Sequence, residues 1–145
     1  MTKVYADFNA LLDVGGPGRH GLVHLDRLGT LRDLCAARLR LREGLTLILR
    51  SDSSEDEDLE IEATVRWSSD PRALDGGCWV GEFDPEAFRD VPAQSERSVS
   101  DWFPCGSCGT NLAADIRRSG LNSSTTCVAC GTRVHALIAP PGDGV

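Results

Sequence analysis

Apolar and polar residues alternate along several short stretches of the first 91 residues, as they do in β-strands with one buried face. The clearest stretch runs from Leu59 to Trp67, where Ile61, Ala63 and Val65 alternate with charged or hydroxyl-bearing side chains. The same reasoning predicts strands at residues 4–12, 21–25, 45–50 and 78–83. Because turn-forming Gly, Asp and Ser clusters separate these segments, the sequence predicts a mainly β fold, built as a small antiparallel β-barrel.

One segment, residues 30–39, has helical rather than strand periodicity. Leu31, Leu34 and Cys35 would share one face of a helix, and Thr30 with Asp33 has the spacing of an N-terminal capping pair. We therefore expect one short helix within the barrel domain.

The alternation ends at residues 92–100, a polar stretch that opens with a proline and predicts a linker. The expected organisation is a β-barrel over residues 1–91, a second module over residues 101–139 and a flexible tail over residues 140–145. No apolar run approaches the ~20 residues that a membrane-spanning helix needs, and the start of the chain lacks the pattern of a signal peptide. We therefore expect a cytoplasmic protein that does not associate with membranes.

The chain carries a formal net charge of −7, all of it in the first 100 residues. These residues hold 12 of the 15 basic and 19 of the 22 acidic side chains, whereas the rest of the chain has three of each. This balance argues against a broad nucleic-acid-binding surface, which needs an excess of Lys and Arg. It favours a protein partner that is neutral or basic.

Four cysteines of the second module form two matched pairs, Cys105 with Cys108 and Cys127 with Cys130, each followed by a glycine. A Cys-x-x-Cys turn can aim two sulfurs at one metal ion, and the 18 residues between the pairs are typical of four-cysteine zinc sites. The glycines allow the positive φ that such turns adopt. We predict one structural Zn²⁺ per chain, because four thiolates leave no coordination position for a catalytic water.

Three other groups of candidate ligands are interpreted as structural. His135 follows the second cysteine pair, but it fits an ordinary strand residue better than a metal ligand. Cys35 and Cys78 lie among apolar neighbours and are expected to be buried thiols. The acidic run from Asp52 to Asp58 lacks the glycine and the spacing of a calcium loop, so we expect a solvated loop there.

Two groups of arginines are candidates for binding. Arg38, Arg40 and Arg42 alternate with leucines and would form a stripe on one face of a strand. Such a stripe could bind a phosphate or an acidic partner, or it could be a solvated face paired with nearby acids. The second group, on the C-terminal module, combines Arg117, Arg118 and Arg133 with Trp102 and Phe103 and could form a small nucleic-acid surface. The alternative is that Trp102 and Phe103 pack against the zinc site.

Residues 101–138 resemble a zinc ribbon. Both Cys-x-x-Cys-Gly motifs are present, and the segments that follow them, Asn111–Ile116 and Arg133–Ile138, are similar to the strands of a ribbon. The resemblance implies a structural metal in a small interaction module attached to another domain.

The first domain resembles the β-barrel of the PilZ family. The resemblance depends on three consecutive patterns, Leu41-x-x-Gly44-x-x-Leu47-x-Leu49, Leu59-x-Ile61-x-Ala63-x-Val65-x-Trp67 and Val80-Gly81-x-Phe83. PilZ receptors bind cyclic di-GMP through an Arg-x-x-x-Arg segment before the barrel and a following Asp/Asn-x-Ser-x-x-Gly motif. Here Arg38 and Arg42 have the first spacing but follow the expected helix, and residues 26–29 lack the serine of the second motif. The resemblance thus implies a PilZ-like barrel without the nucleotide site.

These observations predict a protein that is not an enzyme, since the sequence contains no arrangement of residues typical of a catalytic site. Its expected role is regulatory or scaffolding, through protein–protein contacts. The alternative is a module that binds a nucleotide, such as a cyclic dinucleotide, or nucleic acid, through the arginine stripe or the ribbon surface.

Overall fold

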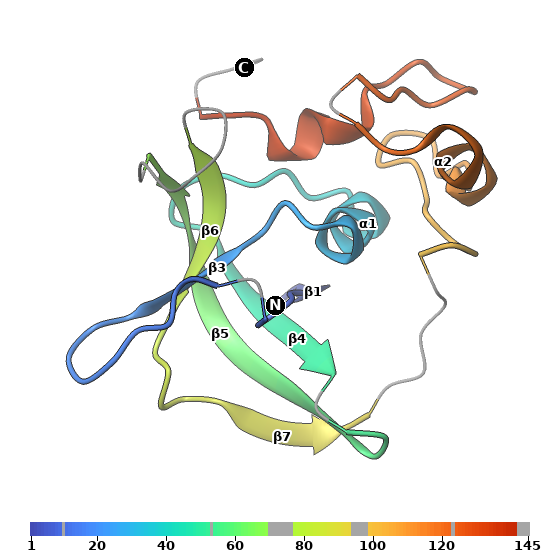
Figure 1. Cartoon of the computed structure of the whole chain (residues 1–145). Helices are drawn as coiled ribbons and strands as arrows, with labels where there is room; N and C mark the ends of the chain where they lie inside the picture. Colours follow the sequence, from blue (N-terminus) through green and yellow to red (C-terminus); the bar gives the residue numbers. More distant parts are fainter. Residues whose placement is uncertain (10, 53, 70–76, 94–98, 123, 142–145) are drawn as a thin grey trace.

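One mixed β-sheet forms the body of the first domain in the computed structural model, which describes residues 1–9, 11–52, 54–69, 77–93, 99–122 and 124–141 (Figure 1). Its strands are β1 (Lys3–Tyr5), β2 (Leu11–Asp13), β3 (Gly21–His24), β4 (Thr46–Asp52), β5 (Glu57–Ser68), β6 (Cys78–Phe83) and β7 (Arg89–Pro92). The strand order is β1-β4-β5-β6-β3-β2, and β7 pairs with β5. The turn expected at residues 68–77, the linker and the tail lie partly outside the described residues.

The sheet differs from the expected antiparallel barrel in two respects. Strand β1 runs parallel to β4, whereas the other pairs are antiparallel, and within the described residues the sheet is not closed into a barrel. The prediction of one strand over residues 4–12 is the source of the error. Asp7 Oδ1 accepts a hydrogen bond of 2.9 Å from the backbone N–H of Asn9, and this turn ends β1. Strands β1 and β2 therefore pair at opposite ends of the sheet, but the mainly β class is confirmed.

The alternation along β5 places its apolar side chains in the main core. Ile61, Ala63 and Val65 are almost fully buried, and they join Leu47 and Leu49 of β4 across the antiparallel register. On the opposite face, the charged residues near the middle of β5 are exposed. The predicted half-buried strand is confirmed, and it supplies the sheet with its hydrophobic face.

The other end of β5 departs from the expected solvated acidic loop. Asp58 and Glu60 are each only 2% exposed. Asp58 pairs with Arg50 of β4 at 3.2 Å, while Glu60 contacts Lys3 at 2.9 Å and Arg89 at 3.3 Å. These carboxylates are buried because each has a cationic partner on a neighbouring strand. The expectation of a solvated loop thus fails at Asp58 and holds at the exposed residues 54–56, and Glu60 departs from the exposed charged face predicted for this strand.

Helix α1 (Leu28–Ala37) is the predicted short helix, and it lies between the sheet and the C-terminal segment in Figure 1. The residues expected to cap it have another role. The hydroxyl of Thr30 donates to the carbonyl of Tyr5 at 2.6 Å, and Asp33 Oδ2 accepts from the Tyr5 N–H at 2.7 Å. The pair thus satisfies backbone groups at the end of β1 and fixes α1 against that strand.

Residues 99–141 pack onto this domain through several tertiary contacts. The N–H of Leu41 donates to the carbonyl of Leu137 at 2.8 Å, and Trp79 Nε1 donates to the carbonyl of Ala139 at 2.9 Å. Arg32 of α1 lies 5.7 Å from the ring centre of Trp102, within range of a cation–π contact. The module expected to follow a linker is therefore in direct contact with the sheet domain.

Candidate metal centre

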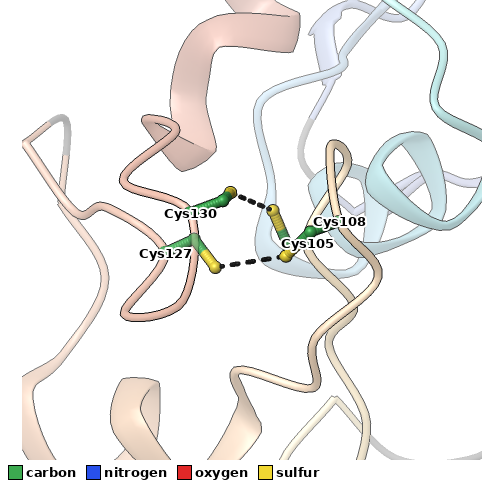
Figure 2. A group of neighbouring side chains, drawn as sticks. All are labelled: Cys105, Cys108, Cys127 and Cys130. Atoms are coloured by element: carbon green, nitrogen blue, oxygen red, sulfur yellow. Dashed lines mark hydrogen bonds between the residues drawn. The ribbon is translucent and has the colours of Figure 1, made fainter.

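Four cysteine sulfurs converge in the C-terminal module (Figure 2). Their Sγ atoms all lie within 4.8 Å of one another, and the Cys105–Cys130 and Cys108–Cys127 separations are both 3.6 Å. Tetrahedral coordination with metal–sulfur bonds of about 2.3 Å would place the sulfurs about 3.8 Å apart. The arrangement therefore fits a single tetrahedral metal ion held by four thiolates.

The first knuckle, residues 105–110, is a tight turn closed by backbone hydrogen bonds. The N–H of Gly109 donates to the carbonyl of Cys105 at 3.0 Å, and the N–H of Cys105 donates to the carbonyl of Thr110 at 2.8 Å. Gly109 has a φ of +81°, as the sequence predicted. The N–H of Ser107 lies 3.4 Å from Cys105 Sγ and would stabilise its thiolate.

The second knuckle, residues 127–132, repeats this geometry. Gly131 donates to the carbonyl of Cys127 at 2.9 Å, and Cys127 donates to the carbonyl of Thr132 at 2.9 Å. Gly131 has a φ of +75°, and the N–H of Ala129 lies 3.4 Å from Cys127 Sγ. Two turns of the same design thus present two sulfurs each, and their backbone N–H groups face the position where negative charge would accumulate.

Two threonine hydroxyls also contact the ligand sulfurs, and our sequence analysis missed them. Thr110 Oγ1 lies 3.2 Å from Cys108 Sγ, and Thr132 Oγ1 lies 3.3 Å from Cys130 Sγ. The hydrogen bonds of Thr132 lower the pKa of Cys130 to about 6, and those of Thr110 lower the pKa of Cys108. The signal was present in the sequence, since both motifs continue as Cys-Gly-Thr.

The four ligands differ in burial. Cys105 and Cys127 are buried, whereas Cys108 and Cys130 are exposed. Burial raises the pKa of Cys127 to about 11. This thiol must lose its proton to bind a metal, so metal binding releases protons and weakens as the pH falls.

The segments after the knuckles are helical, which corrects the predicted ribbon strands. Helix α2 (Ala113–Ser119) replaces the strand expected at residues 111–116, and the 3₁₀-helix η2 (Val134–Ile138) replaces the one expected at residues 133–138. Asn111 lies just before α2, and its Oδ1 accepts hydrogen bonds from the N–H groups of Phe103 and Ala113. The alanines and arginines of α2 are strong helix formers.

The metal-binding module shares a hydrophobic core with α1. Leu31 and Cys35 of α1 belong to the same buried cluster as Phe103 and the ligands Cys105 and Cys127. Gly106 is where the first knuckle touches the helix. A Cβ there would lie 3.5 Å from the Cα of Cys35 and 3.0 Å from Leu137 Cδ1. The first knuckle and the helix are therefore in close contact at Gly106.

The remaining candidate ligands lie outside the four-sulfur cluster. Cys35 and Cys78 are buried, as predicted, and burial together with the negative charge of Cys105 raises the pKa of Cys35 to about 11. Cys78 Sγ lies 3.7 Å from His24 Nδ1 on the sheet. His135 is on η2 rather than a strand, and burial followed by the charge of Arg133 lowers its pKa.

The two groups of candidate arginines lie on different parts of the structure. Arg38, Arg40 and Arg42 lie in the segment between α1 and β4, which contains no strand, so they do not form a one-faced stripe. On α2, Arg118 pairs with Asp115, and Arg117 contacts the carbonyl of Ser100 and, at 3.7 Å, Asp101. Trp102 faces Arg32, and Phe103 is fully buried.

Comparisons with known proteins leave the site to be interpreted from its own geometry. Neither the protein-family models, nor the curated proteins, nor the solved structures contain a match to this chain. The PilZ resemblance therefore has no independent support. In the described ranges, no helix has both the length and the apolar character needed to cross a membrane.

Proposed function

We propose that this chain is a zinc protein with a regulatory or scaffolding role, in which one Zn²⁺ fixes the C-terminal module against α1. Zinc is the metal that best suits four thiolates in tetrahedral geometry. Thiolate ligands on four sides leave no open coordination position, so the metal is structural. The chain then acts through contacts with a protein partner and not through catalysis.

The observation that carries this proposal is the cluster shared by Leu31, Cys35, Cys105 and Cys127. A module of about 40 residues buries too little apolar surface to fold alone, so metal ligation supplies the missing stability. Because the buried ligands pack on α1, the same metal also determines whether the module stays docked. A structural metal thereby defines the shape of the whole surface around the helix.

A neutral or basic protein is the partner we favour. Val128, in the second knuckle, is 71% exposed, so the surface of the metal-binding module is not uniformly polar. The net charge of −7 disfavours a nucleic-acid partner. The alternative of nucleotide or nucleic-acid binding has less support, since Arg117 and Arg118 pair with acids of their own module.

Metal content per chain tests the proposal. The wild-type protein should contain one zinc, Cys127→Ser should lose most of it, and Cys78→Ser should keep it. Cys78 is a suitable control because it is also buried, while serine can replace it as the hydrogen-bonding partner of His24.

Chelation should unfold the C-terminal module and leave the β signal of the sheet. A wild-type protein without zinc, or an unchanged proteolysis pattern around the module after metal removal, would contradict the proposal. Titrations with cyclic di-GMP and short single-stranded oligonucleotides at two salt concentrations test the alternative.

A further inference from the structure

Arg38 occupies an unusual backbone position at the end of α1. Its φ of +54° makes it the one non-glycine residue with positive φ among the residues described. The N–H of Leu39 donates to the carbonyl of Leu34 at 3.0 Å, which closes the helix in a Schellman-type turn. Glycine is the usual residue at such a position, because other side chains disfavour the left-handed conformation. An arginine here calls for an explanation from its side chain.

The guanidinium of Arg38 lies over the first knuckle. Its Nη2 atom is 3.6 Å from the position that a Cβ on Gly109 would occupy, and Gly109 directly follows the ligand Cys108. Cys108 is exposed, so part of the charge on the cluster is accessible to solvent and to a nearby cation. The end of α1 therefore touches the knuckle twice, through Cys35 at Gly106 and through Arg38 at Gly109.

Charge explains why a cation belongs at this junction. Four thiolates and one Zn²⁺ together carry a charge of −2, as the formal charges of the ligand set require. The C-terminus of a helix carries partial negative charge from its unpaired carbonyl groups. Docking the loaded knuckle on the end of α1 thus brings two negative regions together. Within the described part of the chain, no carboxylate pairs with Arg38, which leaves its charge available to the centre.

We propose that Arg38 is a positioning residue that holds the metal-loaded first knuckle against the C-terminus of α1 by its charge. The inference rests on the proposed function, because it assumes a thiolate-bound metal. The left-handed backbone directs the side chain toward Gly109, and the strain of that conformation is tolerated because the charge is needed there. Arg38 then contributes to metal retention without being a ligand.

The test uses the full-length, zinc-loaded protein and measures zinc release to a chromogenic chelator. Arg38→Gln removes the charge and should speed release by about two- to fivefold at low salt, the range expected for an exposed ion pair. The difference should shrink at about 0.5 M salt, where screening is strong. Arg38→Lys should retain most of the effect. Arg42→Gln is the matched control and should release zinc as the wild type does, since Arg42 is exposed in the same segment.

A second variant separates the role of the charge from that of the backbone. Arg38→Gly relieves the left-handed strain, so the chelated protein should resist urea at least as well as the wild type. The same variant should release zinc faster, and relief of backbone strain alone does not predict these opposite changes. Release from Arg38→Gln at the wild-type rate, or a faster release that salt does not alter, would overturn the inference. If the wild type itself holds no zinc, the proposed function fails, whereas zinc-loaded wild type with unaffected Arg38 variants refutes the role of Arg38 alone.

Discussion

The indole Nε1 of Trp79 donates a hydrogen bond of 2.9 Å to the carbonyl oxygen of Ala139. This bond joins the core of the sheet to the chain just after η2, across 60 positions of sequence. Trp79 is 2% exposed and Ala139 is 7% exposed, so the bond is shielded from water. This buried hydrogen bond joins the C-terminal module to the sheet, so the stability lost when it is removed reports whether the module is docked.

Trp79→Phe should destabilise the zinc-loaded protein by about 1 kcal/mol or more. The lost hydrogen bond contributes about that amount, and the smaller ring adds a packing defect. Urea denaturation of the loaded and chelated protein separates these two effects. After chelation only the packing defect should remain, because Ala139 no longer docks. An equal loss of stability in both states would indicate that the module stays docked without metal.

Leu31 and Leu34 lie on the same helix, are both fully buried, and face different cores. Leu31→Ala should weaken docking of the metal module, with a cost of about 2–5 kcal/mol and faster zinc release. Leu34→Ala should destabilise the sheet by a similar amount and alter zinc release less. Parallel urea and zinc-release measurements on the two variants check this. Equal acceleration of zinc release by both would show that α1 does not distinguish the cores.

Sequence patterns predicted the parts of this molecule that depend on neighbours in the chain. The Cys-x-x-Cys-Gly turns are local, so their sulfurs and positive-φ glycines follow from a few residues. The alternation from Ile61 to Val65 of β5 likewise predicts which side chains are buried. By contrast, the parallel pairing of β1 with β4 depends on an Asx turn at Asp7, which interrupts an otherwise continuous alternating pattern.

Long-range contacts were the second source of error. From the sequence, Asp58 is part of a solvated acidic loop, but the pairing of β4 with β5 brings Arg50 within 3.2 Å of it. Leu31 belongs to a helical face that fits either core, and no local pattern shows that it packs against the metal-binding module. Helix α2 was missed because a resemblance to ribbon strands outweighed the helix propensity of Ala113 and its neighbours.

Chelation should expose a fifth thiol in addition to the four ligands. Cys35 is buried under the first knuckle, and the rise of its pKa to about 11 keeps it protonated and unreactive in the docked state. If metal removal releases the module, Cys35 becomes accessible to a thiol reagent. Counting modified thiols by mass should give at least five after chelation, and one fewer in Cys35→Ser. A count of four in the wild type would mean that Cys35 remains covered without metal.

His135 should make the zinc-loaded protein less stable in mild acid. Burial lowers its folded-state pKa below the unfolded value of about 6.5, so the unfolded chain binds more protons as the pH falls. Stability is therefore lost as the pH drops through about 6.5. In His135→Leu this contribution disappears, and the variant should gain on the wild type between about pH 7 and pH 5. Protonation of the cysteines affects both proteins, so the difference between their unfolding free energies isolates His135. A constant difference across this range would contradict the prediction.

The two buried carboxylates of β5 should differ in what their loss costs. Asp58→Asn removes a buried carboxylate 3.2 Å from the buried guanidinium of Arg50, which also lies 3.8 Å from the exposed Asp52. Removing one partner of a buried pair typically costs about 3–5 kcal/mol. Glu60→Gln should cost less, because Lys3 and Arg89 are 46% and 62% exposed and water can solvate them. Urea denaturation of the two variants at neutral pH measures the difference, and a larger penalty for Glu60→Gln would show that burial of the cation does not control the cost.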